Sequence, residues 1–106
     1  MPKQTVRKNE FATLADQGIR AYQQAKRLNL IGIAELDIGT EIGVGTGTVN
    51  GWRRGRITRR YDDLMHFAAI CLKAAPELGE QWVTDLFRAA DMAGYRDRAL
   101  AEIFES

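Results

Sequence analysis

The stretch ELDIGTEIGVGTGTVNGWRR, residues 35–54, constrains the fold more than any other part of this 106-residue chain. Two short helices that cross at a steep angle need a small residue where their backbones approach, and Gly39 provides one. The tight turn between them needs a residue that tolerates a positive φ, which Gly43 provides. Val49 and Trp52, three residues apart, share one face of the second helix and are expected to pack into the core. The stretch therefore predicts two helices joined by a tight turn.

The rest of the sequence also has helical periodicity. Apolar side chains recur at spacings of three and four in residues 9–28, 61–75, 78–90 and 100–104. Composition alone would also fit a short strand over residues 31–38, but the sequence contains no series of alternating strands with hairpin turns. We therefore expect an all-α fold, a compact bundle of five to six helices.

The chain is long enough for one domain and too short for a second independent core. Apolar residues make up 45% and charged residues 27% of the sequence, which is close to globular averages and excludes wholesale disorder. Residues 1–8, MPKQTVRK, carry three cations without apolar periodicity and are expected to form a flexible basic arm. Residues 9–106 are expected to form a single helical domain, with a core in residues 9–75 and a helical extension in residues 76–106.

The charges are unevenly distributed along the chain. Residues 1–60 hold 11 Lys or Arg against 5 Asp or Glu, a balance of +6, whereas residues 61–106 hold 4 against 9, a balance of −5. Together they give the net charge of +1. A basic half attracts a polyanion such as DNA, and an acidic half is better suited to water or to a protein partner. Chance clustering in a short sequence is the alternative explanation.

No segment of the sequence is suited to crossing a membrane. The apolar run at residues 67–72 is far shorter than a membrane span, and the N-terminus lacks the hydrophobic stretch of a signal peptide. The cytoplasm is therefore the expected location. The single cysteine, Cys71, excludes an internal disulfide, and because His66 is the single histidine no metal site is expected.

The sequence contains no complete motif of a nucleotide-binding or catalytic site. Gly43, Gly45 and Gly47 suggest a phosphate-cradling loop, but a Walker loop needs a following Gly-Lys-Ser or Gly-Lys-Thr. The dinucleotide fingerprint needs a third glycine where Asn50 stands. His66 has no neighbouring serine or second cysteine that would complete a catalytic set. We therefore expect neither an enzyme nor a bound cofactor.

The order of apolar and small residues in this central stretch follows a recurring pattern. The matching positions are Ile38-Gly39, Ile42-Gly43-Val44, Val49, Trp52 and Arg54-Gly55, followed by an amphipathic segment from Leu64 to Leu72. In these positions the chain resembles the helix-turn-helix regulators of the lambda-repressor and Cro type, often called the XRE family. The resemblance covers roughly residues 9–75. Similar units also look like the N-terminal modules of large bacterial signalling ATPases.

The resemblance implies a compact, lambda-repressor-like bundle whose third helix reads duplex DNA, commonly as a dimer on promoters or operators of bacteria or phages. It therefore implies a DNA-binding protein, a transcriptional regulator of the repressor type, with the helix around Thr46–Arg54 in the major groove. A symmetric homodimer would place two such helices about 34 Å apart on successive turns of a palindromic site.

The outward face of this helix offers few side chains to a base. Asn50 is suited to pairing with adenine, and Thr46 or Thr48 to contact with a thymine methyl group or a phosphate. One of the two threonines is alternatively expected to cap the helix start. Gly47 and Gly51 are expected on the exposed face, where they destabilise the helix and offer no side chain, so sequence specificity is expected to be poor.

A dense run of cations follows the helix. Its members are Arg53, Arg54, Arg56, Arg59 and Arg60. Contact with DNA phosphates is their expected role. The alternative is a solvated loop with weak ion pairs to Asp62 or Asp63. In the N-terminal arm, Lys3, Arg7 and Lys8 would follow the DNA backbone or enter a minor groove, or else belong to a disordered tail.

The aromatic residues Trp82, Phe87, Tyr95 and Phe104 lie in the acidic extension. They are expected either to cover the first bundle or to form an interface with a second copy or another protein. A second hypothesis for the function follows from this extension and from the two helix glycines. It is a protein-interaction adaptor that retains the helix-turn-helix scaffold without reading DNA.

Overall fold

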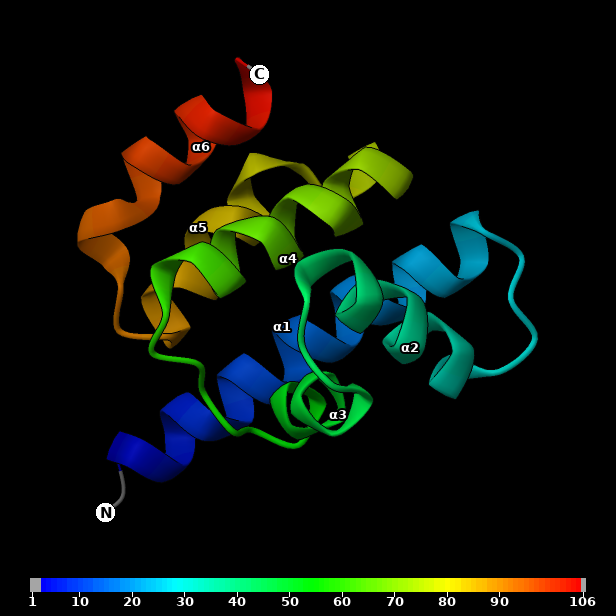
Figure 1. Cartoon of the computed structure of the whole chain (residues 1–106). Helices are drawn as coiled ribbons and strands as arrows, with labels where there is room; N and C mark the ends of the chain where they lie inside the picture. Colours follow the sequence, from blue (N-terminus) through cyan, green and yellow to red (C-terminus); the bar gives the residue numbers. More distant parts are fainter. Residues whose placement is uncertain (1–2, 106) are drawn as a thin grey trace.

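The computed structural model describes residues 3–105 of the chain, and these residues form six α-helices without a strand. The helices are α1 (Lys3–Ala25), α2 (Ile31–Ile42), α3 (Thr46–Arg53), α4 (Tyr61–Ala74), α5 (Gly79–Ala89) and α6 (Arg96–Phe104) (Figure 1). Short 3₁₀ helices at Pro76–Leu78 and Ala93–Tyr95 precede α5 and α6. The predicted all-α bundle is confirmed, at the upper end of the expected number of helices.

One expectation about the first half of the chain is wrong, the start of the first helix. The first helix begins at Lys3 instead of Asn9, so residues 3–8 of the expected flexible arm are helical, while residues 1–2 lie outside the described part. Lys, Gln and Arg are good helix formers, which explains why this segment extends the helix without an apolar stripe. Residues 31–38, which also fitted a strand, form the beginning of α2.

Helix α1 is the helix against which much of the molecule packs. It runs across the bundle and contacts α2, α3, α4 and α5 (Figure 1). Phe11, Ala15, Ile19 and Tyr22 are buried along one stripe of this helix, at the spacings expected of an amphipathic helix. Full burial of a side chain as large as Phe or Ile contributes about 1.5–3 kcal/mol to stability. The stripe on α1 therefore holds several helices in one core.

A row of aromatic rings joins the predicted core to the C-terminal extension. Trp52 on α3 packs edge-on against Phe67 on α4, with ring centroids 5.2 Å apart, and Phe67 lies 6.1 Å from Trp82 on α5. The indole nitrogen of Trp82 donates a hydrogen bond to the carbonyl oxygen of Leu14, at 2.9 Å. At Gly18 a Cβ would lie 2.5 Å from the Trp82 ring. Helix α5 is therefore part of the same core as the first four helices.

The four aromatic residues of the extension divide into two pairs. Trp82 and Phe87 are buried, as expected for residues that cover the first bundle. Tyr95 and Phe104 are 48% and 54% exposed.

None of the helices in residues 3–105 combines the length and the apolarity that a membrane crossing requires.

Candidate nucleic-acid interface

The turn between α2 and α3 depends on two glycines, as the sequence predicts. Gly43 ends α2 with a φ of 92°, and its amide donates to the carbonyl oxygen of Gly39, at 2.8 Å. A residue with a side chain is strained in this left-handed conformation. At Gly39 a Cβ would lie 2.8 Å from the carbonyl oxygen of Val44, so only glycine allows the chain to approach so closely. The predicted roles of both glycines are confirmed.

Helix α3 is anchored by its apolar face and begins without a side-chain cap. Val49 and Trp52 are 0% and 2% exposed, as predicted. The residue before the helix is Gly45, and no side chain hydrogen-bonds to the amides of the first turn. The expectation that Thr46 or Thr48 caps the helix is therefore wrong. Thr46 is exposed and remains available for contact with a ligand.

Asn50 and Arg53 belong to a partly buried polar cluster, which consists of Asp16, Glu35, Asn50 and Arg53. The Nε atom of Arg53 donates to Asp16 at 2.9 Å, and its Nη1 atom donates to Glu35 at 2.9 Å. The amide of Asn50 donates to the same oxygen of Glu35, at 3.0 Å. The cluster therefore joins α1, α2 and α3.

The position of Glu35 explains why the cluster holds its members. Only 5% of Glu35 is exposed, and a buried carboxylate without partners costs several kcal/mol of stability. The hydrogen bond to Glu35 raises the pKa of Arg53, although burial acts in the opposite direction. Arg53 therefore acts as the internal partner of Glu35. Its guanidinium donates to two carboxylates, whereas its position in the sequence suggested that it faces solvent and contacts DNA phosphates.

Asp16 extends the cluster to the surface. Its second oxygen accepts a hydrogen bond from Arg20, one turn further along α1, at 2.8 Å. Partial burial raises the pKa of Asp16, but the hydrogen bonds from Arg20 and Arg53 outweigh this effect and lower the pKa below 3.8. Asp16 is therefore a charged partner of Arg53 over the whole neutral pH range.

Helix α3 also borders a concave surface, which we call the basic hollow. Three segments line it: the outward face of α3 with Gly47, Asn50, Gly51 and Arg54; the following loop with Gly55, Arg56, Ile57 and Arg59; and the end of α5 with Ala89, Ala90 and Asp91. Its volume is about 650 Å³. The outward face of α3 is therefore recessed between the loop and α5.

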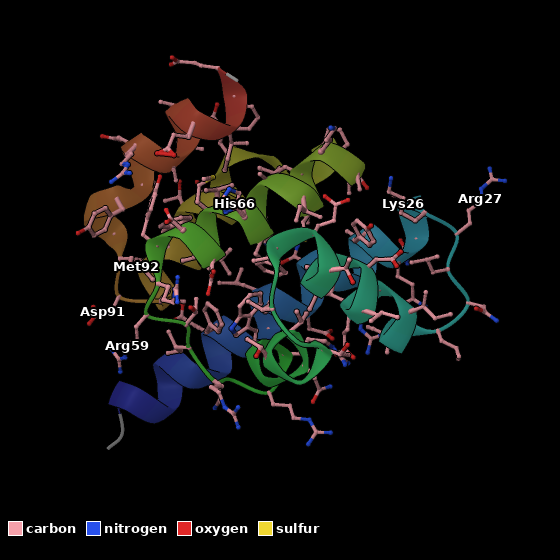
Figure 2. The ribbon with its side chains drawn as sticks, viewed as in Figure 1. Lys26, Arg27, Arg59, His66, Asp91 and Met92 are labelled. Atoms are coloured by element: carbon pink, nitrogen blue, oxygen red, sulfur yellow. The ribbon has the colours of Figure 1, made fainter. Side chains whose placement is uncertain are left out.

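Three arginines at the basic hollow have no acidic partner among the residues that the structure describes. Arg54, Arg56 and Arg59 are exposed, and no ion pair or hydrogen bond joins their guanidinium groups to another described residue. Figure 2 shows Arg59 on the same side of the molecule as Asp91. Arg60 differs from them, because it lies 3.7 Å from Asp63 and outside the hollow. The predicted run of five arginines thus divides into one internal residue, three at the hollow and one beside α4.

The two glycines of α3 also differ from each other. Gly47 is exposed, and a Cβ built there would have no neighbour within 4 Å. Gly51 was expected to be exposed as well, but it is buried because the side chain of Arg56 covers it, with Cδ 3.4 Å from the position of a Cβ. The small size of Gly51 therefore lets Arg56 lie across the helix at the floor of the hollow.

Sequence reasoning missed Asp16, Glu35 and the end of α5 as parts of this region. Asp16 lies 37 positions from Arg53, so no local pattern connects them. The end of α5 is likewise distant from α3 in the sequence.

Comparisons with models of known families, with curated proteins and with solved structures find no match for this chain.

Proposed function

We propose that the protein binds duplex DNA, chiefly through the backbone phosphates, and acts as a transcriptional regulator of the repressor type. In this proposal α3 is directed toward the major groove, and Arg54, Arg56 and Arg59 contact phosphates. The observation that carries the proposal is the convergence of these three unpaired arginines on one hollow beside α3. The guanidinium group is suited to this role, because its planar fork of donors matches the oxygens of a phosphate.

The contrast with the other arginines supports this assignment. Among the arginines whose side chains are described, five have a carboxylate oxygen within 2.9 Å: Arg20, Arg53, Arg88, Arg96 and Arg98. The chain therefore contains carboxylates that pair with arginines in several places, but none of the described ones pairs with the three at the hollow. Unpaired cations gathered at one concave surface favour an external anion as the partner.

Base recognition is expected to be weak in this proposal. Asn50 and Arg53 are held by Glu35, and Gly47 offers no side chain. Thr46 and Thr48 remain for contact with a base or a phosphate. Because phosphate contacts carry little sequence information, we expect similar affinities for unrelated duplexes.

The test is a fluorescence-anisotropy titration of labelled duplexes of unrelated sequence at several salt concentrations. Three phosphate contacts predict that the logarithm of the binding constant falls with the logarithm of the salt concentration with a slope of about −3. Saturable binding with such a slope for every duplex supports the proposal. The absence of binding at about 50 mM salt, where phosphate contacts are much stronger than at physiological salt, contradicts it.

A protein-interaction adaptor is the second candidate function. Two observations favour it: α3 is recessed within the basic hollow, and its polar residues Asn50 and Arg53 have internal partners. An acidic protein segment would then occupy the hollow.

Association into a homodimer stays a prediction for both functions, and the exposed rings of Tyr95 and Phe104 are candidate contacts. Sedimentation velocity at several protein concentrations tests it, since a monomer at every concentration contradicts it.

A further inference from the structure

The side-chain amide of Asn50 lies between the polar cluster and the basic hollow. Asn50 lines the hollow and is half-buried, and its Nδ2 atom donates to the Oε2 atom of Glu35 at 3.0 Å. The same Oε2 atom accepts a hydrogen bond from the Nη1 atom of Arg53, at 2.9 Å. Asn50 therefore belongs to both regions, and the two polar atoms of its amide have different surroundings.

Glu35 fixes the orientation of this amide. A guanidinium group only donates hydrogen bonds, so the Oε2 atom that binds Arg53 acts as an acceptor. The carbonyl oxygen of an asparagine also only accepts, and if it faced Oε2, two acceptors would lie against each other. The Nδ2 atom of Asn50 must therefore face Glu35. Because only 5% of Glu35 is exposed, little water competes for this bond.

The oxygen of the same amide remains open to a ligand. Within residues 3–105 no group donates a hydrogen bond to the Oδ1 atom of Asn50. Every fully buried polar side-chain atom in this part of the chain has a hydrogen-bond partner, so an oxygen without one is in contact with solvent. Asn50 thus presents an acceptor at a surface where Arg54, Arg56 and Arg59 present donors.

An acceptor at this place restricts what binds to Asn50. The oxygens of a backbone phosphate carry no hydrogen, so they are suited to the arginines and not to Oδ1. In the major groove, the N6 amino group of adenine and the N4 amino group of cytosine are donors, whereas guanine and thymine show acceptor atoms. The oxygen of Asn50 therefore suits a base with an exocyclic amino group.

We propose that Glu35 is a positioning residue that leaves the oxygen of Asn50 toward the DNA, so that adenine or cytosine is favoured over guanine or thymine at one position of the bound site. This inference rests on the proposed function and deepens it. The arginines supply most of the affinity, and Asn50 adds a small preference among bases. The bond to Glu35 does not withdraw Asn50 from binding; it selects the half of the amide that the ligand meets.

The test begins with the selection of bound duplexes from a random library at low salt. We expect one position of the enriched duplexes to hold adenine or cytosine. In one enriched duplex, this base is then replaced by its analogue without the amino group, purine for adenine or 2-pyrimidinone for cytosine. Loss of a single hydrogen bond is expected to weaken binding to the wild type about fivefold. Asn50→Ala is expected to bind both duplexes equally.

Two substitutions of Glu35 separate positioning from folding. Glu35→Gln keeps an oxygen that accepts from Asn50 and Arg53, so we expect the fivefold difference to persist. Glu35→Leu removes the acceptor and frees the amide to rotate, so we expect the difference to disappear. A folding defect would instead lower the affinity for both duplexes by the same factor, because it reduces the fraction of competent protein.

The possible failures of the inference and of the proposed function are distinguishable. Enrichment of guanine or thymine, enrichment of no base at any position, or an unchanged difference in Glu35→Leu overturns the inference. The proposed function still stands in these cases, because duplexes bind. The absence of binding to any duplex contradicts the proposed function and the inference together.

Discussion

The polar cluster and the basic hollow meet at Asn50 on α3 but use arginine in opposite ways. In the cluster, Arg53 is 19% exposed in its side chain and bonds to two carboxylates. At the hollow its neighbour Arg54 is exposed and has no such partner. The adjacent arginines at the end of α3 thus differ in environment, because Arg53 faces α1 and α2 whereas Arg54 faces the hollow. Whether such a cation stabilises the fold or is available to an external anion therefore depends on the carboxylates that face it. Its position in a basic run of the sequence does not decide this.

The largest expected effect comes from removing the arginines of the hollow. In the variant Arg54→Ala, Arg56→Ala, Arg59→Ala we expect duplex affinity to fall on the order of 100-fold at low salt, and the salt dependence to flatten, because the phosphate contacts are lost. Thermal stability is expected to fall only slightly, because none of the three groups has an ion pair with a described residue and only Arg56 makes a described packing contact, across Gly51. Anisotropy and thermal denaturation measure the two quantities.

The matched control for this variant removes the same charge from exposed cations elsewhere. Lys26 and Arg27 lie at the end of the molecule opposite Arg59 (Figure 2), and Lys73 is exposed near the end of α4. The control is Lys26→Ala, Arg27→Asn, Lys73→Ala, with asparagine chosen because residue 27 has a φ of 58°. An equal loss of affinity in the control would mean that net charge alone, and not the hollow, causes binding.

The next effect compares Arg53→Ala with Arg54→Ala by urea denaturation followed with circular dichroism. Arg53→Ala leaves the buried carboxylate of Glu35 without its cation, so we expect the free energy of unfolding to fall by about 2 kcal/mol. Arg54→Ala removes no internal contact and is expected to change stability by about 0.5 kcal/mol or less. Equal effects of the two substitutions would remove the distinction between the cluster and the hollow.

A smaller effect is expected at Gly47, the exposed glycine of α3. Gly47→Ala introduces a Cβ into open space within a helix, so we expect the free energy of unfolding to rise by about 0.5–1 kcal/mol. Gly39→Ala is the contrasting substitution, because its Cβ would meet the carbonyl oxygen of Val44 and destabilise the turn. Urea denaturation of both variants tests this. A loss of stability in Gly47→Ala would show that a neighbour occupies this side of α3.

The smallest effect is the pH dependence caused by Asp16 in the polar cluster. The hydrogen bonds from Arg20 and Arg53 lower its pKa below 3.8 in the folded state, despite the opposing effect of burial. The stabilisation is therefore fully present above about pH 5 and disappears as the pH falls through the lowered pKa. We expect the difference in unfolding free energy between the wild type and Asp16→Asn to be constant near neutral pH and to shrink in acid. A difference that grows in acid would contradict the assignment.

The parts of the structure that the sequence predicts depend on short-range constraints. The roles of Gly39 and Gly43 follow from backbone geometry within one turn, and the burial of Val49 and Trp52 follows from helical periodicity. The class of fold follows in the same way, from the apolar stripes of several helices. These features need no knowledge of how distant helices pack.

The parts that the sequence did not predict depend on contacts between distant segments. The hydrogen bond between Asp16 and Arg53 forms only because α1 packs beside α3. No local sequence pattern marks Gly18 within its helix, but a Cβ at this position would collide with the ring of Trp82, where α5 covers α1. The α5 wall of the hollow has the same origin. A list of cations and glycines near a helix therefore identifies the region of a site but not which of its members are free.

The burial of Cys71 has a consequence for how the molecule opens. Its side chain is fully buried near Gly18, and burial raises the pKa of its thiol, so in the closed molecule it meets no reagent and forms little thiolate. A thiol reagent therefore modifies it only in the moments when the packing around it separates. When the reagent reacts faster than the packing recloses, the rate of modification equals the rate of these openings, so Cys71 is a built-in probe of how often the core opens.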